Sequence, residues 1–274
     1  MSLANATRSE LTKQFTTSLW WILGLVLLFY IGSTAGGLAG VFGAVAAGII
    51  GPGTTNGTPI PGDSLAPIIY SLATAVGYVF PLLIGTLLVT GEFRHKTLTP
   101  TFLAVPRRGV ALGGKVAAGI VMGLLYGVVA LTATVGPGAA ILAAFGVDTQ
   151  LGASGTWAML GRIVVAFVLW TLIGIGVGTL VRNQVAAVVG VIAFTQFVEP
   201  IARMVGVFVK GVSGVTHYLP GAASDALVGT SIYSTLGGAT DDGLAWWGGG
   251  LVLLGYAAVL LVLGYLFSWR RDVS

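Results

Sequence analysis

Residues 91–108 read GEFRHKTLTPTFLAVPRR, and this stretch decides how the rest of the chain is interpreted. It is the most polar run in the sequence, and long apolar segments lie on both sides of it. A charged stretch between two apolar segments is typical of a loop that joins two membrane helices. We therefore expect residues 91–110 to form a loop on the cytoplasmic side of a membrane. A short helix is expected over residues 96–103, with Thr97, Thr99 and Thr101 exposed on it.

The composition points to the same class of protein. Of the 274 residues, 55% are hydrophobic and only 8% are charged, whereas a soluble domain carries about 25% charged residues. A membrane helix needs about 20 apolar residues, so the chain has room for a single transmembrane domain over residues 1–274. The sequence predicts an all-α membrane protein with six transmembrane helices.

The expected spans are the six long apolar segments. They cover approximately residues 20–50, 65–90, 111–135, 157–181, 185–200 and 244–267. We expect Pro81 to kink the second span, because neighbouring helices can satisfy the freed carbonyl. Gly136-Pro137-Gly138 is expected to end or break the third span. The apolar run after Lys13 is too long for the core of a cleaved signal peptide.

The N-terminal region is expected to form a short interfacial helix within residues 1–19. Thr7 and Glu10 have the spacing of a capping box, and Leu11, Phe15 and Leu19 share one helical face. Such a helix would lie at the cytoplasmic surface and lead into the first span. A frayed terminus is the alternative.

Six spans place both termini on the same side, and the charges assign that side to the cytoplasm. Ten of the thirteen basic residues then fall inside, in agreement with the positive-inside rule. They are Arg8, Lys13, Arg94, Lys96, Arg107, Arg108, Lys115, Arg182, Arg270 and Arg271. The net charge of +4 is thereby explained by loops facing the cytoplasm, and no nucleic-acid partner is expected.

Residues 204–243 are less apolar than the spans around them. Lys210, His217, Asp225, Asp241 and Asp242 all lie in this segment. We expect two half-length, re-entrant helices here, which dip into the outer leaflet between the fifth and sixth spans without crossing it.

Glycines four residues apart suggest where helices approach one another closely. They are Gly32, Gly36 and Gly40 in the first span, and Gly119, Gly123 and Gly127 in the third. Small residues at this spacing form a stripe against which another membrane helix can pack. Chance is the alternative in a chain that holds 43 glycines.

Residues that could carry out catalysis are few. The run GVALGGK at residues 109–115 matches the start of a P-loop, but Val116 stands where Ser or Thr should bind Mg²⁺ and no strand precedes it. The two histidines have no partners at metal-ligand spacing. We expect neither an enzyme nor a metal site, and no cofactor on this chain. Glu199 and Arg203 have the spacing of a helical ion pair, which could be functional or simply structural.

The loop and the N-terminal region together resemble a known family. The run at residues 91–108, a lysine soon after it at Lys115, and the sequence ELTK at residues 10–13 are similar to bacterial type-2 ATP-binding-cassette (ABC) exporter permeases, especially actinobacterial ones. The six spans and Leu219-Pro220 in the last outer segment fit the same pattern.

The resemblance implies a permease that pairs with a second permease subunit, identical or different, in the bacterial cytoplasmic membrane. Two copies of a separate cytoplasmic ABC ATPase subunit would bind ATP and Mg²⁺ and drive transport. The loop at residues 91–110 would act as a coupling helix on that subunit. The residues implied in coupling are Glu92, Arg94, His95, Lys96, Thr97, Thr101, Arg107 and Arg108.

Other readings stay open from the residues alone. The loop could serve only to fix topology, although residues 182–184 suffice for that elsewhere in the chain. A transporter driven by an ion gradient would need carboxylates within the membrane, for which Glu199 is the candidate. A membrane protein of immunity or assembly, which binds a ligand without transport, is the third class.

Overall fold

The computed structural model describes residues 2–50, 62–208, 213–230 and 244–269. Within these ranges the chain is helical and contains no strand. Six helical segments are long and apolar enough to cross a membrane. The predictions of an all-α multi-pass membrane protein and of six spans are therefore confirmed.

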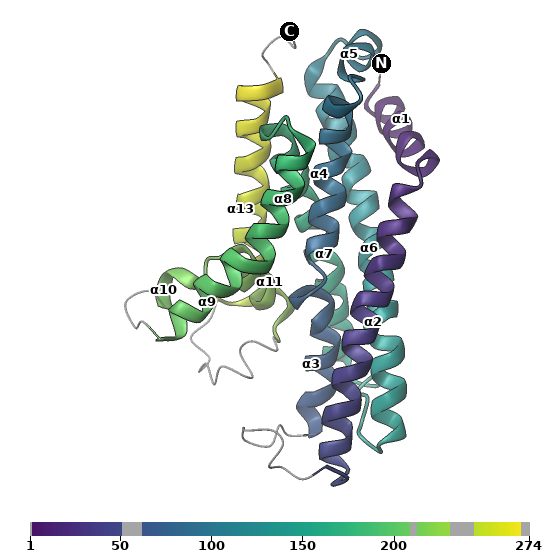
Figure 1. Ribbon diagram of the computed structural model, residues 1–274, viewed down its shortest axis with the longest axis vertical. Coiled ribbons are helices and arrows are strands. Elements are labelled where there is room, and N and C mark those ends of the chain that lie inside the picture. The colour runs from purple at the N-terminus through teal and green to yellow at the C-terminus, as the bar shows by residue number, and fades with distance from the viewer. Residues whose placement is uncertain (1, 51–61, 209–212, 231–243, 270–274) are drawn as a thin grey trace.

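Except for α9, which projects sideways from the bundle, the helices of the six spans run roughly along the long axis of the molecule (Figure 1). They are α2 (Leu19–Ala46), α3 with α4 (Gly62–Ala75 and Val79–Arg94), α6 (Arg108–Ala144), α7 (Ser154–Leu180), α8 with α9 (Gln184–Ala193 and Glu199–Phe208) and α13 (Trp246–Gly264). The shorter helices are α1 (Leu3–Thr16), α5 (Leu98–Ala104), α10 (Ser213–Thr216) and α11 (Pro220–Val228). Helices α1 and α5 lie at one end of the bundle, which we call the α5 end.

Helices α4 and α7 form the centre of the bundle. The most apolar window of the α3–α4 span is 89% buried and that of α7 is 67% buried, against 22% for α2 and 17% for α13. Gly85 of α4 faces the backbone of Thr171, and Gly174 of α7 faces the backbone of Leu82, so a Cβ atom at either glycine would collide. This close approach brings the Thr86 hydroxyl within 3.2 Å of the carbonyl oxygen of Gly174, to which it donates.

The predicted glycine stripes lie at two helix contacts. Gly119, Gly123 and Gly127 all face α7, where a Cβ atom would meet Ile175, Val168 and Val164. On α2, Cβ atoms at Gly32 and Gly36 would lie 3.5 and 3.3 Å from atoms of α6, but one at Gly40 would have no neighbour within 4 Å. The stripe of the third span thus lies in a tight contact, whereas that of the first span is only partly in contact.

The expected capping box is wrong. Helix α1 begins four residues earlier than Thr7, where the side chain of Ser2 accepts a hydrogen bond from the Asn5 amide at 3.3 Å. The Thr7 hydroxyl donates to the carbonyl of Leu3 instead. The expected apolar stripe is broken as well, because α1 ends at Thr16 and Leu19 begins α2.

Of the two expectations about proline, one fails and one is confirmed. Helix α6 does not end at residues 136–138 but continues through Pro137 to Ala144. Proline removes one backbone donor, and packing in a membrane bundle can offset that loss. The second span is interrupted at residues 76–78, between α3 and α4. Pro81 has no N–H to donate to the carbonyl of Gly77, four residues earlier, so the break lies where this proline is expected to kink the span.

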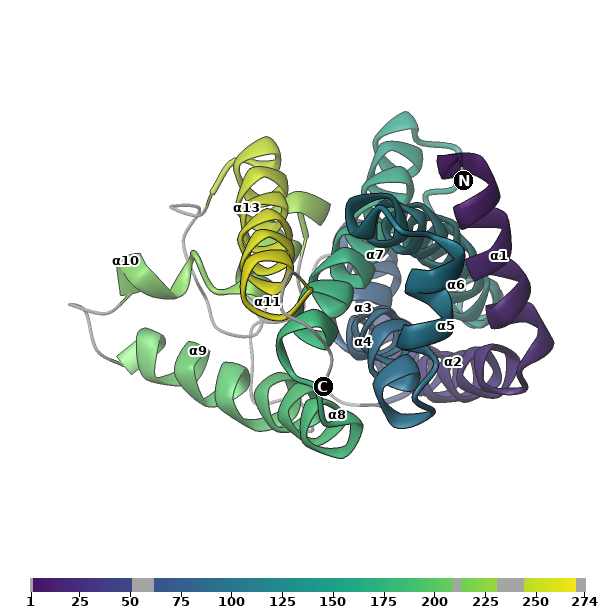
Figure 2. The ribbon, with the colours of Figure 1, turned by 90° about the horizontal axis from the view of Figure 1, so that it is seen from above.

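The segment expected to be re-entrant is described in part. Helix α9 turns away from the axis of α8 through a π-helical turn, Phe194–Val198, and α11 packs between α7, α3 and α13 (Figures 1 and 2). Lys210, Asp241 and Asp242 lie outside the described residues, as do Arg270 and Arg271. The depth of this segment in a membrane stays a prediction.

Candidate functional site: the α5 platform

The predicted loop folds into a short helix that stands at the end of the bundle between α4 and α6 (Figure 1). Helix α4 ends at Arg94, and Lys96 takes the left-handed backbone conformation, with φ of 54°, that turns the chain. The Thr97 amide donates to the carbonyl of Glu92 at 3.0 Å, and α5 begins at Leu98. We call residues 94–108 the α5 platform.

A network of four charged side chains lies beneath the platform. It joins Glu10 and Lys13 of α1 to Glu92 of α4 and Lys115 of α6. The Lys13 ammonium lies 2.7 Å from Glu10 Oε1 and 2.8 Å from Glu92 Oε1. The Lys115 ammonium lies 2.7 Å from Glu10 Oε2 and 2.9 Å from Glu92 Oε2. Each carboxylate therefore contacts both ammonium groups, and the network carries no net charge.

The network is buried, which makes its internal pairing essential. Lys115 is fully buried and Glu10 and Glu92 are nearly so, whereas Lys13 is partly exposed. A buried charge that loses its partner costs far more than an exposed one. These four residues therefore hold α1, α4 and α6 in one arrangement.

The pairing shifts the pKa values of the two network members on α1 in opposite directions. Burial by itself would raise the pKa of the Glu10 carboxyl, but Lys115 and Lys13 outweigh burial and hold that pKa below its ordinary value. Burial would likewise lower the pKa of the Lys13 ammonium, but hydrogen bonds to Glu10 and Glu92 raise it above its ordinary value. Both groups are ionised at neutral pH.

Thr101 connects α5 to this network. Its hydroxyl lies 3.3 Å from Glu92 Oε1 and 3.4 Å from Lys13 Nζ, and it also donates to the carbonyl of Thr97 at 2.8 Å. Leu98, one turn earlier, is buried against a small apolar cluster that includes Val105 and Leu88. The inner face of α5 is therefore fixed by both polar and apolar contacts.

The other side of the platform is bound to the far end of the chain. Arg108 Nη1 donates to the carbonyl of Trp269 at 3.0 Å, and Trp269 Nε1 donates to the carbonyl of Arg108 at 3.0 Å. The Phe102 ring meets the Trp269 ring edge-on at 5.4 Å, and the Arg108 guanidinium lies 5.2 Å from the centre of the Phe102 ring. These contacts join α5 to the π-helical turn Tyr265–Trp269 that follows α13.

The structure divides the eight predicted coupling residues into two groups. Arg94, His95, Lys96, Thr97 and Arg107 are exposed. Glu92 is buried, and Thr101 and Arg108 are half-buried and bonded within the chain. The expectation that Thr101 is exposed is wrong, because its hydroxyl turns inward to Glu92.

Four further residues of this site were not predicted as its members: Glu10, Lys13, Lys115 and Trp269. One signal was available for Lys115, because an isolated lysine within an apolar segment requires an acidic partner. No local spacing points to Glu10, which is 105 residues away from that lysine.

The GVALGGK run, residues 109–115, lies within α6 and is helical. It forms no loop that could surround a phosphate group. Among the residues that the structure describes, no group of three or more His, Asp or Glu side chains is arranged to hold a metal ion.

A second polar cluster joins α9 to α11. Arg203 lies 3.8 Å from Glu199 and 2.8 Å from Asp225 of α11. Glu199 is buried and accepts a hydrogen bond from the Gly221 amide in the first turn of α11. The Tyr78 hydroxyl, in the break between α3 and α4, donates to the carbonyl of Thr195 at 2.8 Å and lies 3.5 Å from Glu199 Oε2.

Arg162 takes no part in this α9–α11 cluster through any contact that the structure describes. Its guanidinium lies 5.8 Å from the centre of the Trp246 ring, at the start of α13. It also lies beside Gly229, which ends α11.

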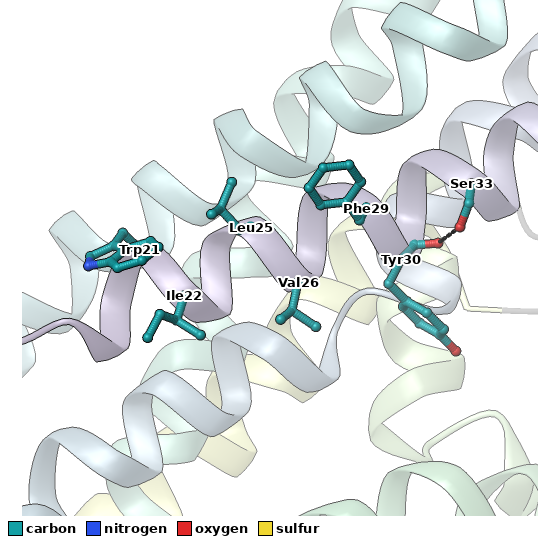
Figure 3. A pocket seen from close by; sticks show the side chains of 7 residues that line it. All are labelled: Trp21, Ile22, Leu25, Val26, Phe29, Tyr30 and Ser33. Carbon is teal, nitrogen blue, oxygen red and sulfur yellow. Dashed lines mark hydrogen bonds between the residues drawn. The ribbon is translucent and has the colours of Figure 1, made fainter.

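An open apolar groove follows the outward face of α2 (Figure 3). It is lined by Trp21, Ile22, Leu25, Val26, Phe29, Tyr30 and Ser33. Most of these side chains are exposed, as is suitable for a helix that faces lipid or another membrane subunit. The groove holds no charged side chain.

No family model matches the chain, and comparison with curated proteins gives no match either.

Proposed function

We propose that this chain is the membrane-spanning permease subunit of a bacterial ABC exporter, driven by a separate cytoplasmic ATPase subunit. The observation that carries the proposal is the α5 platform, a short exposed helix fixed from two sides to the ends of the membrane helices. The likeness of residues 91–108 to the loop of such permeases supports the same assignment.

The platform has the mechanical properties that such a role requires. A force applied to α5 would reach α4, α6 and α1 through Glu92, Lys115 and Glu10, and α13 through Trp269. The exposed cations would set the register of a partner on this surface more than they would supply affinity. A partner that changes shape on binding or hydrolysing ATP would then shift the balance between two arrangements of the helices.

The orientation follows from the same charges. With the α5 end in the cytoplasm, Arg8, Arg94, Lys96 and Arg107 lie on the inner side, as the positive-inside rule requires. Both termini are then cytoplasmic. The α9–α11 cluster would lie toward the outer side, and α9 to α11 would be the re-entrant segment.

The remaining parts of the transporter would come from other chains. ATP and Mg²⁺ would bind the ATPase subunits, of which two are expected, and this chain would have no catalytic residue. A second permease subunit, identical or different, would complete the substrate pathway. Walls rich in Gly, Ala, Val and Leu suit an amphipathic or lipid-like substrate.

The second candidate is a transporter driven by an ion gradient. The buried Glu199 carboxylate lies in the fifth span, and an ionisable group there marks a functional site by default. In that class the α9–α11 cluster, rather than the α5 platform, would be the working site.

The deciding experiment is affinity purification of the tagged chain from its native membranes in mild detergent. We expect a soluble subunit with an intact GxxxxGK[ST] motif to accompany it in stoichiometric amount. The variant Arg94→Glu/Arg107→Glu should lose that subunit, and the charge-preserving control Arg94→Lys/Arg107→Lys should retain most of it. A folded wild-type chain that brings no such subunit would contradict the proposal.

A further inference from the structure

One exposed side chain on the α5 platform is not explained by contact with lipid. Leu103 is 78% exposed, the largest value among the exposed large hydrophobic side chains in the described part of the chain. Most of the others lie along the six apolar spans, where lipid can cover them. Leu103 instead lies in α5, beyond the ends of α4 and α6 (Figure 1).

The surface near Leu103 carries one sign of charge. The exposed ionisable side chains of residues 91–108 are Arg94, His95, Lys96 and Arg107, and all four are basic types. The single acid of this stretch, Glu92, is buried in the network below. A partner that covers the platform must therefore offer acidic groups around the contact with Leu103.

The backbone that carries Leu103 is held in place before any partner arrives. Its neighbour Phe102 packs against Trp269 and Arg108, and Thr101 is bound to Glu92. An anchor whose backbone is already fixed has only its own side chain left to order on binding, so more of its burial appears as affinity. In protein interfaces a few residues near the centre carry most of the binding energy, and Leu103 is the exposed apolar side chain of this surface that could take such a position.

We infer that Leu103 is the apolar anchor of the α5 platform, and that it inserts into an apolar socket with an acidic rim on a soluble protein. The inference rests on the proposed function, in which that protein is the ATPase subunit. It adds the chemistry of the contact: one leucine in the socket, basic side chains at its rim, and no contribution from the buried Glu92.

The test compares Leu103→Asp with Ile49→Asp. Ile49 is 70% exposed and follows the opposite end of α2, so it controls for the cost of placing a charge at an exposed apolar position. We expect Leu103→Asp to lower the amount of co-purified ATPase subunit at least tenfold, and Leu103→Ala to lower it severalfold. Ile49→Asp should leave it unchanged.

A second measurement does not depend on capture. The chain has no cysteine, so Leu103→Cys and Ile49→Cys each provide a single thiol. We expect the purified ATPase subunit to slow maleimide labelling at position 103 and not at position 49. The protection should weaken with added salt, because screening acts on the charges of the rim.

The outcomes distinguish failure of the Leu103 anchor from failure of the proposed function. If the ATPase subunit accompanies Leu103→Asp as well as it does the wild type, or leaves the thiol at position 103 fully reactive, the anchor is wrong and the proposed function stands. If the wild-type chain brings no ATPase subunit at all, the proposed function fails, and the anchor inference fails with it.

Discussion

Two clusters of buried charged side chains join helices in this molecule, and they balance their charges in different ways. The network beneath the α5 platform pairs two carboxylates with two ammonium groups, and each side chain contacts both opposite partners. The α9–α11 cluster has two carboxylates and one guanidinium. Its charge imbalance is offset by the first turn of α11, whose Gly221 amide donates to Glu199. A helix N-terminus carries about half a positive charge.

The difference teaches what each cluster can tolerate. The platform network joins three helices through side chains alone, so the loss of one side chain leaves a buried charge unbalanced. The α9–α11 cluster depends in part on backbone, and its Arg203 keeps a second partner in Asp225 when Glu199 is removed. We therefore expect a substitution in the platform network to destabilise the whole bundle, and a substitution in the α9–α11 cluster to loosen α11 alone.

The largest effect should come from Lys115→Met. Lys115 is fully buried, and its removal leaves Glu10 and Glu92 to share Lys13 alone. Breaking a buried charge pair on one side costs about 3–5 kcal/mol, which should appear as a lower midpoint of thermal unfolding in detergent. Adding Glu92→Gln should recover part of the loss by restoring one acid to one base. A single variant as stable as the wild type would show that the network carries no net stability.

A smaller and more local effect is expected from Glu199→Ala. It leaves the Gly221 amide without its acceptor, at a cost of about 1–3 kcal/mol. Hydrogen exchange of backbone amides should rise in α11 and stay unchanged in α5. Glu199→Gln keeps an acceptor oxygen and serves as the control. Faster exchange throughout the bundle would mean that this cluster is as global in its effect as the platform network.

Thr101→Val tests the link between α5 and the network. The valine keeps the shape of the side chain and removes the hydroxyl that contacts Glu92 and Lys13. We expect a loss of about 1 kcal/mol, measured as the unfolding midpoint. Thr99→Val, at an exposed position of the same helix, should change the midpoint less. An equal loss in both variants would mean that the lower helix propensity of valine, and not the lost contact with the network, causes the effect.

The smallest effect should be that of pH near neutrality. The pKa of Glu10 is lowered on folding, so its contribution is present above the ordinary glutamate pKa and is lost as pH falls through the lowered value. The pKa of Lys13 is raised, so its contribution is present below the ordinary lysine pKa and is lost as pH rises through the raised value.

The expected profile is therefore a plateau of unfolding midpoint between about pH 5 and pH 10, with a decline on each side. The alkaline decline should be shallow, because Lys13 is partly exposed and screened by solvent. In Glu10→Gln the acid decline should weaken. A midpoint that changes steadily through pH 7 would contradict the assignment of these two groups.

The sequence predicted the spans because hydropathy and length are sufficient signals in a membrane protein. The prediction of where helices end failed where Gly and Pro were read as they would be in a soluble protein. Gly136-Pro137-Gly138 would end a helix in water, yet α6 continues, with Gly138 packed against Ile69 of α3. The interruption of the second span at residues 76–78 was indicated by Pro81, which cannot donate to the carbonyl of Gly77 four residues earlier.

The α5 platform shows which residues of a site can be predicted from the sequence and which cannot. The exposed basic residues were predicted, because surface charge is visible as composition. The pairing of Glu10 with Lys115 was not, since it joins positions 105 residues apart that only the fold brings together. Likewise, the spacing of Glu199 and Arg203 suggested an ion pair, but the shorter contact of Arg203 is with Asp225, which no helical spacing indicates.

The length of α6 has a consequence for the environment of this protein. Its 37 residues extend over about 55 Å at 1.5 Å per residue, while the hydrocarbon core of a bilayer is about 30 Å thick. Even at a tilt of about 40°, the upper end of the usual range, roughly ten residues of α6 remain outside that core. In the far half of the helix, Gly138 contacts α3 and Ile141 contacts α2. The ends of α2, α3 and α6 therefore pack against one another, and we expect this tip to stay folded in a micelle or nanodisc thinner than the native membrane.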